Sequence, residues 1–353
     1  MSELPKRFID ECGWLKVGDL SNDLVVSSRI RLARNIEGIP FSQWASSSDL
    51  RRIADKTREA ISRSAKLKDA NIFNIEELDS IDRYFLVERY MISRELAKSG
   101  IERYVAIHPE QTSSVMINEE DHLRIQVLTA GHRLRENWEW INTLDSELER
   151  HIPYAYSNTY GYLTACPTNV GTGIRCSVMV HLPALVLSRK IEKVLSAVTQ
   201  IGLTVRGMGG EGSDISGNLF QISNQWTLGI SEEQTIEKIE KILQQIIEQE
   251  RHAESQMLEE NRTSVEDKVW RAYATLRYAR VLSTTELVEL LSTLRLGRSL
   301  EILDFPDIDS INEKLISLRP AHLKLRAGRS LSSQERDEYR AELTRQWLAD
   351  GYR

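Results

Sequence analysis

The chain has 353 residues, of which 41% are hydrophobic and 28% charged, with a formal net charge of −6. The composition is that of a globular protein, and the length favours two or three domains over one. The mildly acidic balance gives no general attraction to nucleic acid or to an anionic membrane, so any phosphate-binding role must come from local clusters. The three cysteines lack CxxC spacing, which indicates neither a disulfide framework nor a zinc site and fits a reducing cytoplasm. We therefore expect a cytoplasmic protein with neither nucleic acid nor a membrane as partner.

Helical and strand-like patterns alternate over the first 250 residues. Apolar residues at helical spacing predict helices over residues 50–61 and 134–148. Strands are predicted where runs of β-branched and aromatic residues begin, at Ser27, Arg83, Arg103, Ser113, Tyr160, Ile174, Leu203 and Leu219. Several connections are too short for a crossover helix, so the expected fold class is α+β, with a largely antiparallel sheet flanked by helices.

A helical region begins after Ser231. The residues SEEQ from Ser231 form a capping box, and isoleucine and leucine follow at helical spacing. Further capping boxes at Ser264-x-x-Asp267 and Ser332-x-x-Glu335 are predicted to begin helices, whereas strand signals are scarce. We therefore expect two domains, at residues 1–253 and 254–353, the second of them all-helical.

Two arginines stand out in the first predicted strand, which reads SSRIR. Arg29 and Arg31 alternate, so both side chains lie on one face of the strand, where two like charges favour a bound anion. A solvent-facing strand with scattered charges explains this pair equally well.

A second cluster is NEEDHLR, from Asn118 to Arg124. On a strand, Glu120, His122 and Arg124 would share one face, which places a carboxylate and a guanidinium within reach of one ligand. A histidine between carboxylates is more often structural than catalytic, and acidic runs are more often solvated turns than metal sites. No metal site is predicted.

Two glycine-containing loops follow. The segment CPTNVGTGIR, from Cys166 to Arg175, describes a tight loop whose hydroxyl and amide donors suit an oxyanion. No histidine base can be assigned to Cys166, so a ligand-contacting or buried thiol is favoured over a nucleophile. The segment RGMGGEGS, from Arg206, contains a literal GxGxxG, but a strand rather than a helix follows, which excludes the dinucleotide fingerprint. It predicts a loop that carries Glu211 and closes over a ligand.

Taken in order and spacing, SSRIR, NEEDHLR, CPTNVGTGIR and RGMGGEG resemble the motifs of the guanidino (phosphagen) kinase family, which moves the γ-phosphate of ATP onto a guanidinium nitrogen. The resemblance implies a guanidino kinase/glutamine synthetase-like catalytic domain and ATP with Mg²⁺ as cofactors. It implies that Glu120, Glu211 and Cys166 are catalytic, with Glu120 as base. The nucleotide-binding residues that it implies are Ser27, Ser28, Arg29, Ile30, Arg31, Tyr90, Arg124, Arg175, Cys176, Ser177, Val178, Met179, Arg206, Gly207, Met208, Gly209, Gly210 and Glu211.

Within this family the chain is most similar to the bacterial protein arginine kinase branch (McsB type). Only 26 residues precede SSRIR, whereas kinases of free arginine or creatine carry a helical domain there, and a helical region of about a hundred residues follows instead. Tyr90 departs from the branch, which tends to have a nucleotide-contacting histidine at that position. The segment RDEYRA resembles the branch's phosphoarginine-binding signature RDxxRA, which implies binding by Arg336, Asp337, Arg340 and Ala341; an ordinary exposed charged helix is the alternative.

The resemblance implies a protein arginine kinase that marks proteins for a Clp-type unfoldase and protease, with a zinc-binding activator protein as partner and a homodimer as assembly. Two alternatives remain open. One is a kinase of free arginine or another small guanidino compound. The other is a phosphoarginine-binding adaptor with an inactive kinase domain.

Overall fold

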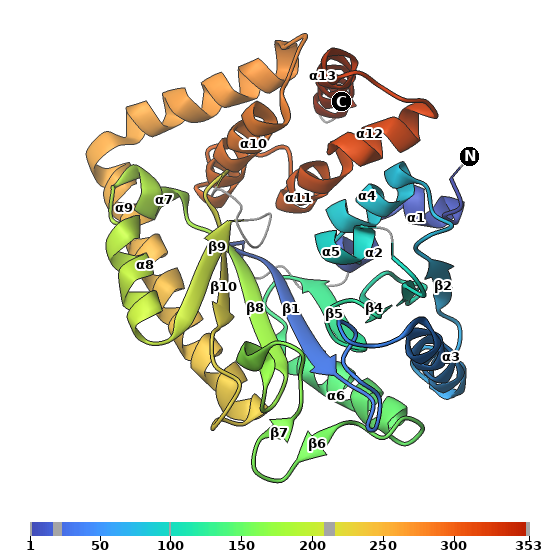
Figure 1. Cartoon of the computed structure of the whole chain (residues 1–353). Coiled ribbons are helices and arrows are strands. Elements are labelled where there is room, and N and C mark those ends of the chain that lie inside the picture. The colour runs from blue at the N-terminus through green and yellow to red at the C-terminus, as the bar shows by residue number, and fades with distance from the viewer. Residues whose placement is uncertain (1, 17–22, 99, 208–215, 351–353) are drawn as a thin grey trace.

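A large antiparallel sheet organises the first part of the chain (Figure 1). The computed structural model describes residues 2–16, 23–98, 100–207 and 216–350. Within these ranges the sheet has eight strands in the order β2-β3-β4-β5-β1-β8-β10-β9, and every neighbouring pair is antiparallel. The strands are β1 (Val25–Arg34), β2 (Asn71–Asn74), β3 (Tyr104–Ile107), β4 (Ser113–Ile117), β5 (Leu123–Ala130), β8 (Ile174–His181), β9 (Leu203–Gly207) and β10 (Leu219–Asn224).

A short hairpin of β6 (Tyr156–Ser157) and β7 (Gly161–Tyr162) stands apart from this sheet. The helices of the first part and the first half of α9 pack on the sheet, and the second half of α9 forms a second core with α10 to α13. They are α1 (Lys6–Asp10), α2 (Gly13–Lys16), α3 (Ser47–Arg63), α4 (Ser80–Glu88), α5 (Arg94–Ala97), α6 (Leu134–Glu149), the 3₁₀ turn η1 (Pro167–Asn169), α7 (Pro183–Leu187), α8 (Ile191–Gln200), α9 (Glu232–Tyr278), α10 (Thr284–Ser299), α11 (Ile308–Ser317), α12 (Pro320–Ala327) and α13 (Ser333–Asp350). The predicted α+β class is confirmed.

Local signals explain where several helices begin. The Ser231 hydroxyl accepts from the amide of Gln234, whose side chain returns to the Ser231 amide, so the predicted capping box is confirmed at the start of α9. The same exchange joins Ser332 and Glu335 at the start of α13. The helices predicted over residues 50–61 and 134–148 are α3 and α6.

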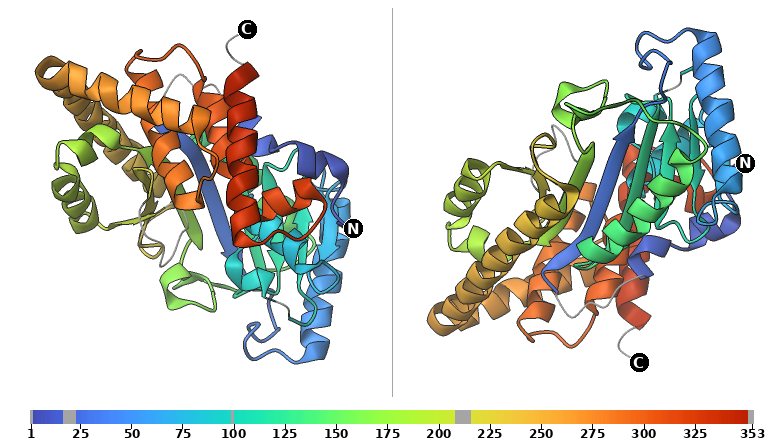
Figure 2. Two further views of the ribbon diagram at one scale, coloured as in Figure 1. Left: turned by 90° about the horizontal axis from the view of Figure 1, so that it is seen from above. Right: turned by 90° about the horizontal axis from the view of Figure 1, so that it is seen from below.

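Two predictions of secondary structure are wrong. The run from Arg83 is not a strand but lies largely in α4, because Asp79 caps that helix and its apolar residues are buried on one side. No helix begins at Ser264, which lies inside α9; the only non-helical backbone within that helix is at Asn261, three residues earlier. Figure 2 shows α9 continuing past the sheet into the C-terminal helices.

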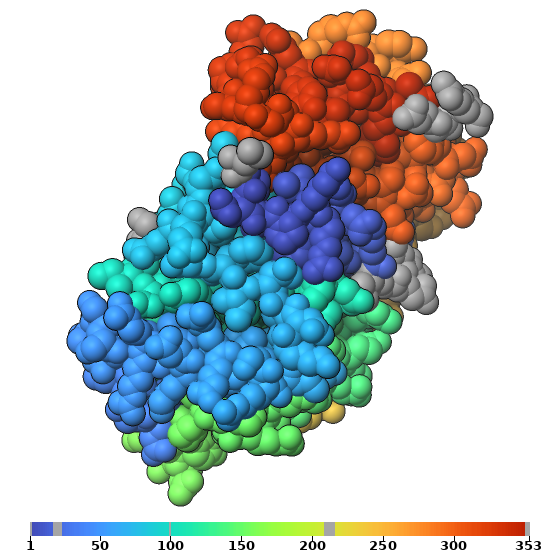
Figure 3. Space-filling view, turned by 90° about the vertical axis from the view of Figure 1, so that its right-hand side faces the viewer, coloured from blue at the N-terminus to red at the C-terminus, as the bar shows by residue number. Residues whose placement is uncertain are grey.

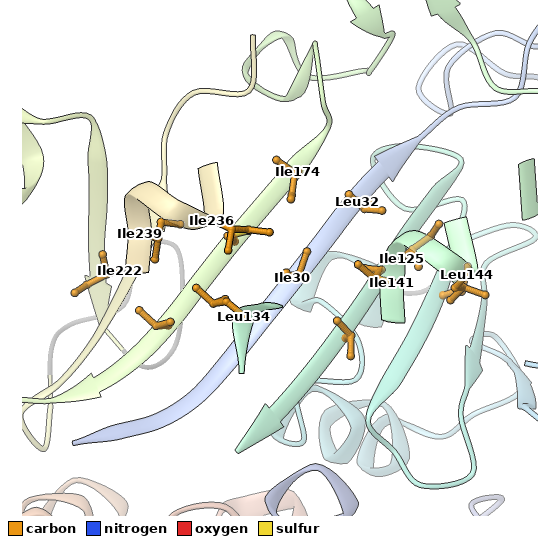
Figure 4. Close-up of a cluster of buried hydrophobic side chains, with 14 of the residues drawn as sticks. Ile30, Leu32, Ile125, Leu134, Ile141, Leu144, Ile174, Ile222, Ile236 and Ile239 are labelled. Carbon is orange, nitrogen blue, oxygen red and sulfur yellow. The ribbon is translucent and has the colours of Figure 1, made fainter. Parts of the chain in front are cut away.

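One face of the sheet is the main hydrophobic core. Ile30, Leu32, Ile125 and Ile174 project from it toward apolar residues of α6 and α9 (Figure 4). Full burial of one such side chain contributes about 1.5 to 3 kcal/mol, so this face fixes both the register and the helices laid across it.

The opposite face is divided. Helices α1, α2, α4 and α5 cover it over β3 to β5, where Met116 and Leu128 are buried. Side chains of α9 to α13 pack over its far end, against Val26, Met179 and Leu219. Figure 3 shows the C-terminal helices lying against the N-terminal segment. Between these two coverings the face is polar. Within the described ranges, no helix has both the length and the apolar character needed to cross a membrane.

Candidate active site

The strand register gathers arginines on the polar face. Arg31 of β1 lies opposite Arg175 of β8, and residues paired across strands project from the same face of a sheet. Ala33, on the same face of β1 as Arg31, is paired with Arg124 of β5. On the other side, Gln221 of β10 is paired with Met179 of β8 and with Arg206 of β9, so the face continues to β9. Five predicted arginines therefore share it: Arg29, Arg31, Arg124, Arg175 and Arg206.

The electrostatics of this face favour an anion. Burial, followed by repulsion from neighbouring arginines, lowers the pKa of Arg29 to about 10 and that of Arg31 well below its ordinary value. The Nε atom of Arg31 is buried and makes no hydrogen bond to any described residue. Oxygen atoms of a polyphosphate would relieve the repulsion and accept these donors.

Neighbouring side chains orient the arginines. Arg29 donates to Oε1 of Gln221 at 2.9 Å, and Arg124 donates to both carboxylate oxygens of Glu119 at 2.7 and 2.9 Å. Although burial opposes it, the charge of Arg124 lowers the pKa of Glu119. The guanidinium groups are thus held in place before any ligand arrives.

The acidic segment before β5 is a turn, not a strand. The prediction that Glu120, His122 and Arg124 share a strand face is therefore wrong. His122 is fully buried, accepts from the amide of Ile36 at 3.0 Å and lies 2.8 Å from the carbonyl of Pro40, so it is structural. Glu120 is exposed at the tip of the turn.

Asp121 joins this turn to the loop that carries Cys166. Its Oδ1 atom accepts from Asn35 Nδ2 and from the backbone amide of Ala165, both at 2.7 Å. Ala165 precedes Cys166, whose half-buried sulfur lies 3.0 Å from the hydroxyl of Thr168. The turn with Glu120 and the loop with Cys166 are therefore fixed to each other.

A small, open cleft lies where these parts meet. Its lining includes Glu120, Arg31, Arg124, Arg175 and Asn169, from the acidic turn, three strands and the Cys166–Arg175 loop. A carboxylate and three guanidinium groups thus line one small cleft. This arrangement suits transfer of a phosphoryl group to a cationic acceptor.

The Cys166–Arg175 loop is held from below by Arg34. The Arg34 guanidinium is buried, pairs with Asp145 at 2.7 Å and donates to the carbonyl of Thr172 at 2.9 Å. Gly171 and Gly173 have φ values of 114° and 65°, and a Cβ on Gly173 would lie 2.7 Å from the carbonyl of Ala33. The tight loop predicted from the glycines is confirmed.

Not every predicted nucleotide-binding residue presents its side chain to the polar face. Ile30, Cys176 and Val178 point into the hydrophobic core, and the Ser28 hydroxyl donates to the carbonyl of Gly131 on that same side. Met179 packs against the C-terminal helices. Ser27 and Ser177 share the arginine face, Gly207 ends β9, and Tyr90 is held beside β5. Met208, Gly209, Gly210 and Glu211 lie outside the described residues.

Comparisons with known proteins agree with this geometry. Residues 52–253 match the ATP:guanido phosphotransferase C-terminal catalytic domain, and residues 262–352 match the protein-arginine kinase McsB C-terminal domain. A protein-arginine kinase of Desulforamulus reducens is 43% identical over 340 residues, which cover 95% of each chain. One from Pelotomaculum thermopropionicum is 41% identical over 340 residues, 96% of each chain. The chain belongs to the protein-arginine kinase family.

A solved guanidino kinase shares the fold. The duplicated taurocyamine kinase of Schistosoma mansoni, solved with transition state analog components, matches with a TM-score of 0.61 and 24% identity. The match covers 71% of this chain and 36% of that one. The guanidino kinase fold predicted from the four motifs is confirmed.

The predicted phosphoarginine motif of this family member is divided between surface and interior. Arg340 is completely buried and donates to the carbonyls of Leu318 at 3.0 Å and Leu282 at 2.6 Å, and to Asp337 at 2.5 Å. Arg336 is half-buried and donates to the carbonyl of Leu331 at 3.0 Å. Arg340 thus ties α13 to two other segments, Ala341 is buried beside it, and only Arg336 and Asp337 reach solvent.

Sequence reasoning missed several residues that build the site of this kinase family member. Glu119 carries no predicted role, although it lies in the same motif, five residues before its partner Arg124. Asp121 was in the same motif, but its partners Asn35 and Ala165 come from other segments. Asp145, which holds Arg34, lies in a helix whose pattern signalled only amphipathicity.

Proposed function

We propose that this chain transfers the γ-phosphate of ATP to arginine side chains of proteins. The observation that carries the proposal is the single cleft in which Glu120 faces Arg31, Arg124 and Arg175. Relatives that cover almost the whole chain are named protein-arginine kinases, which supports a protein-borne acceptor.

The arginines act on the phosphates. Phosphoryl transfer passes through a loose transition state, so catalysis depends mainly on positioning and on neutralising charge on the phosphate oxygens. Guanidinium forks do this with two parallel hydrogen bonds and keep their proton. Because the guanidinium groups repel one another without an anion, a bound triphosphate is favoured over a smaller or neutral ligand.

Glu120 acts on the acceptor. A free arginine side chain has a pKa above about 12, so its nitrogen is a poor nucleophile until a proton leaves. The Glu120 carboxylate lies at the cleft, where it orients the cationic acceptor by charge and takes its proton. Glu211 is proposed as the second orienting carboxylate and Cys166 as the thiol beside the acceptor.

Mg²⁺ is proposed as the metal that accompanies ATP. It prefers oxygen ligands and is held mainly by the substrate phosphates, and carboxylates line the same cleft. When bound, it neutralises developing charge on the phosphate oxygens. Among the described residues no group of three or more His, Cys, Asp or Glu side chains forms a separate metal site.

The wider role is proposed from the same family. We infer that the phosphorylated proteins pass to a Clp-type unfoldase and protease in the cytoplasm, that a zinc-binding activator protein assists, and that the kinase works as a homodimer. Two domains, at residues 1–253 and 254–353, are proposed to divide catalysis from phosphoarginine recognition, to which Arg336 and Asp337 contribute from α13.

One experiment separates the candidate functions. The chain is incubated with ATP, Mg²⁺ and an unfolded acceptor protein, and the products are analysed by mass spectrometry under conditions that preserve P–N bonds. The proposal predicts phosphoarginine on the acceptor and little ADP with free arginine. Saturable ADP release with free arginine would instead favour a kinase of small guanidino compounds, and no ADP release in either case would favour an adaptor.

A further inference from the structure

The cleft that contains Glu120 lies at one end of the sheet. Its lining comes from the end of β1, the turn before β5 and the start of β8, which the antiparallel pairing brings to the same end. Figure 1 shows the β6–β7 hairpin at this end, near the arrowhead of β1. The C-terminal helices pack at the opposite end, against Val26, Met179 and Leu219.

Large apolar side chains are exposed around this end of the sheet. They belong to the segment between β1 and α3, to the β6–β7 hairpin and to the segment between β10 and α9. We call them the apolar rim: Trp44, Tyr156, Tyr160, Trp226 and Leu228, with exposed fractions between 55% and 72%. A single exposed apolar residue is ordinary, but several large ones gathered around one opening are typical of a binding surface.

The segment with Trp44 is joined to the acidic turn that carries Glu120. Asn35, which directly follows β1, donates to Asp121 at 2.7 Å. Further along the same segment, the carbonyl of Pro40 lies 2.8 Å from His122 Nε2. Trp44 therefore belongs to the wall of the cleft that contains Glu120.

The other four rim residues flank the loop from Cys166 to Arg175, which lines the cleft on its other side. On one flank, the amide of Tyr162 in the hairpin donates to the carbonyl of Gly171 at 2.8 Å. On the other, the amide of Thr172 donates at 2.9 Å to the carbonyl of Thr227, the residue between Trp226 and Leu228. Backbone hydrogen bonds thus connect both flanks directly to the loop.

Two of the exposed rings are held in place by their neighbours. The ring of Trp226 lies directly on Gly202, where any side chain would collide with it, and Lys238 Nζ is 5.1 Å from its centroid. The ring of Tyr156 meets that of Tyr162 edge-on at 5.3 Å. A surface that is ordered before binding loses less conformational entropy when a ligand arrives.

We propose that the apolar rim binds apolar side chains that flank the target arginine in the acceptor polypeptide. This rests on the proposed function in one respect, that the cleft receives an arginine that is part of a polypeptide chain. Such an arginine cannot enter without its neighbours. An extended chain advances about 3.3 Å per residue, so residues a few positions from the arginine pass over the rim. The cleft recognises the guanidinium by charge, and the rim selects among arginines by their neighbours.

The test measures peptide binding to the full chain by fluorescence anisotropy, without nucleotide, so that the reading does not depend on phosphoryl transfer. Two labelled peptides of equal length and charge each contain one central arginine. In one the arginine is flanked on both sides by leucine and phenylalanine, and in the other by serine at the same positions. The apolar peptide should bind the wild-type chain about tenfold more tightly than the serine peptide.

Substitutions in the rim should remove this preference. Trp226→Ser should weaken binding of the apolar peptide by about threefold to tenfold and leave the serine peptide within about twofold. Combining Trp44→Ser, Tyr160→Ser and Trp226→Ser should bring the two affinities within about twofold of each other. The matched control is Tyr84→Ser, which removes an exposed aromatic residue of α4, beside α12, and should change neither affinity.

Equal affinity of the wild-type chain for the two peptides would overturn the proposal, and so would an unchanged preference in the triple variant. If that variant has a changed sedimentation coefficient but the wild-type preference, the rim is a contact between two copies of the chain, and the proposal fails. If the variants at Trp226 do not fold, an unchanged preference in Trp44→Ser combined with Leu228→Ser has the same consequence.

The variant Glu120→Gln separates this result from the proposed function. It removes the charge that attracts the arginine, so it should weaken both peptides by the same factor and preserve the preference between them. If it weakens neither peptide while the preference depends on the rim, the result counts against the proposed role of Glu120 alone and supports the rim as a binding surface.

Discussion

The ion pair between Arg34 and Asp145 gives a stability prediction with a defined size. Three hydrogen bonds join the two side chains, at 2.7, 3.0 and 3.2 Å, and the exposed fractions are 1% for Arg34 and 7% for Asp145. The guanidinium also lies 3.6 Å from the centroid of the Tyr162 ring. Removing one partner of a buried pair leaves an uncompensated charge and costs about 3 to 5 kcal/mol. Asp145→Asn keeps an acceptor oxygen, so we expect a loss near about 3 kcal/mol.

Urea unfolding, followed by tryptophan fluorescence, measures this loss as a lower midpoint. The control Glu59→Gln removes the acid from an exposed pair with Arg63 and should leave the midpoint unchanged. The double variant Arg34→Met with Asp145→Leu should recover much of the stability lost in Asp145→Asn, because no buried charge remains. A wild-type midpoint in Asp145→Asn would refute the assignment of this pair as a buried, charge-compensated contact.

Three further predictions concern catalysis, recognition and pH. Glu120→Gln should abolish phosphoryl transfer and leave ATP affinity within about threefold, as measured by product analysis and calorimetry; retained transfer would remove Glu120 as base. Arg336→Ala should weaken binding of a phosphoarginine peptide without changing the melting temperature, whereas Arg340→Ala should lower that temperature, because it leaves buried carbonyls without donors. Burial lowers the pKa of His322 to about 4, below its ordinary 6.5, so the folded state favours the neutral ring. This preference adds up to about 3 kcal/mol to the free energy of unfolding. The contribution is complete above pH 6.5 and is lost as the pH falls toward 4. His322→Gln should flatten the dependence of the melting temperature on pH over this range, and an unchanged slope would contradict the assignment.

That the arginines share one face was largely predictable, because part of the information is local. The two arginines of SSRIR are two positions apart, which places both side chains on one face of a strand whatever its partner strands are. The resemblance of the motifs to those of the guanidino kinases predicts nucleotide binding for Arg124, Arg175 and Arg206 as well. The register between strands, which places Arg31 opposite Arg175, needed the structure.

The errors came from signals that compete or act at a distance. Aromatic and β-branched residues after Arg83 favour a strand. The segment is nevertheless helical, because Asp79 caps its first turn and Phe85 and Leu86 are buried on one side of the helix. Arg340 shares a helix face with Arg336 by spacing, yet which face turns inward depends on Leu282, just before α10, and on Leu318, just after α11, which lie far away in the sequence. Arg319 carried no signal at all, because its contact with Tyr90 spans 229 residues.

Helix α9 belongs to both halves of the molecule. Ile239 and Leu243 are part of the core beneath the sheet, whereas Val269 and Tyr273 are part of the core of the C-terminal helices. Its backbone departs from helical geometry only at Asn261. The C-terminal helices are therefore connected to the sheet by a helix and not by a flexible linker. Movement of one half relative to the other requires α9 to bend at Asn261 or to lose a helical turn. A truncation near residue 253 would interrupt a helix that belongs to both hydrophobic cores.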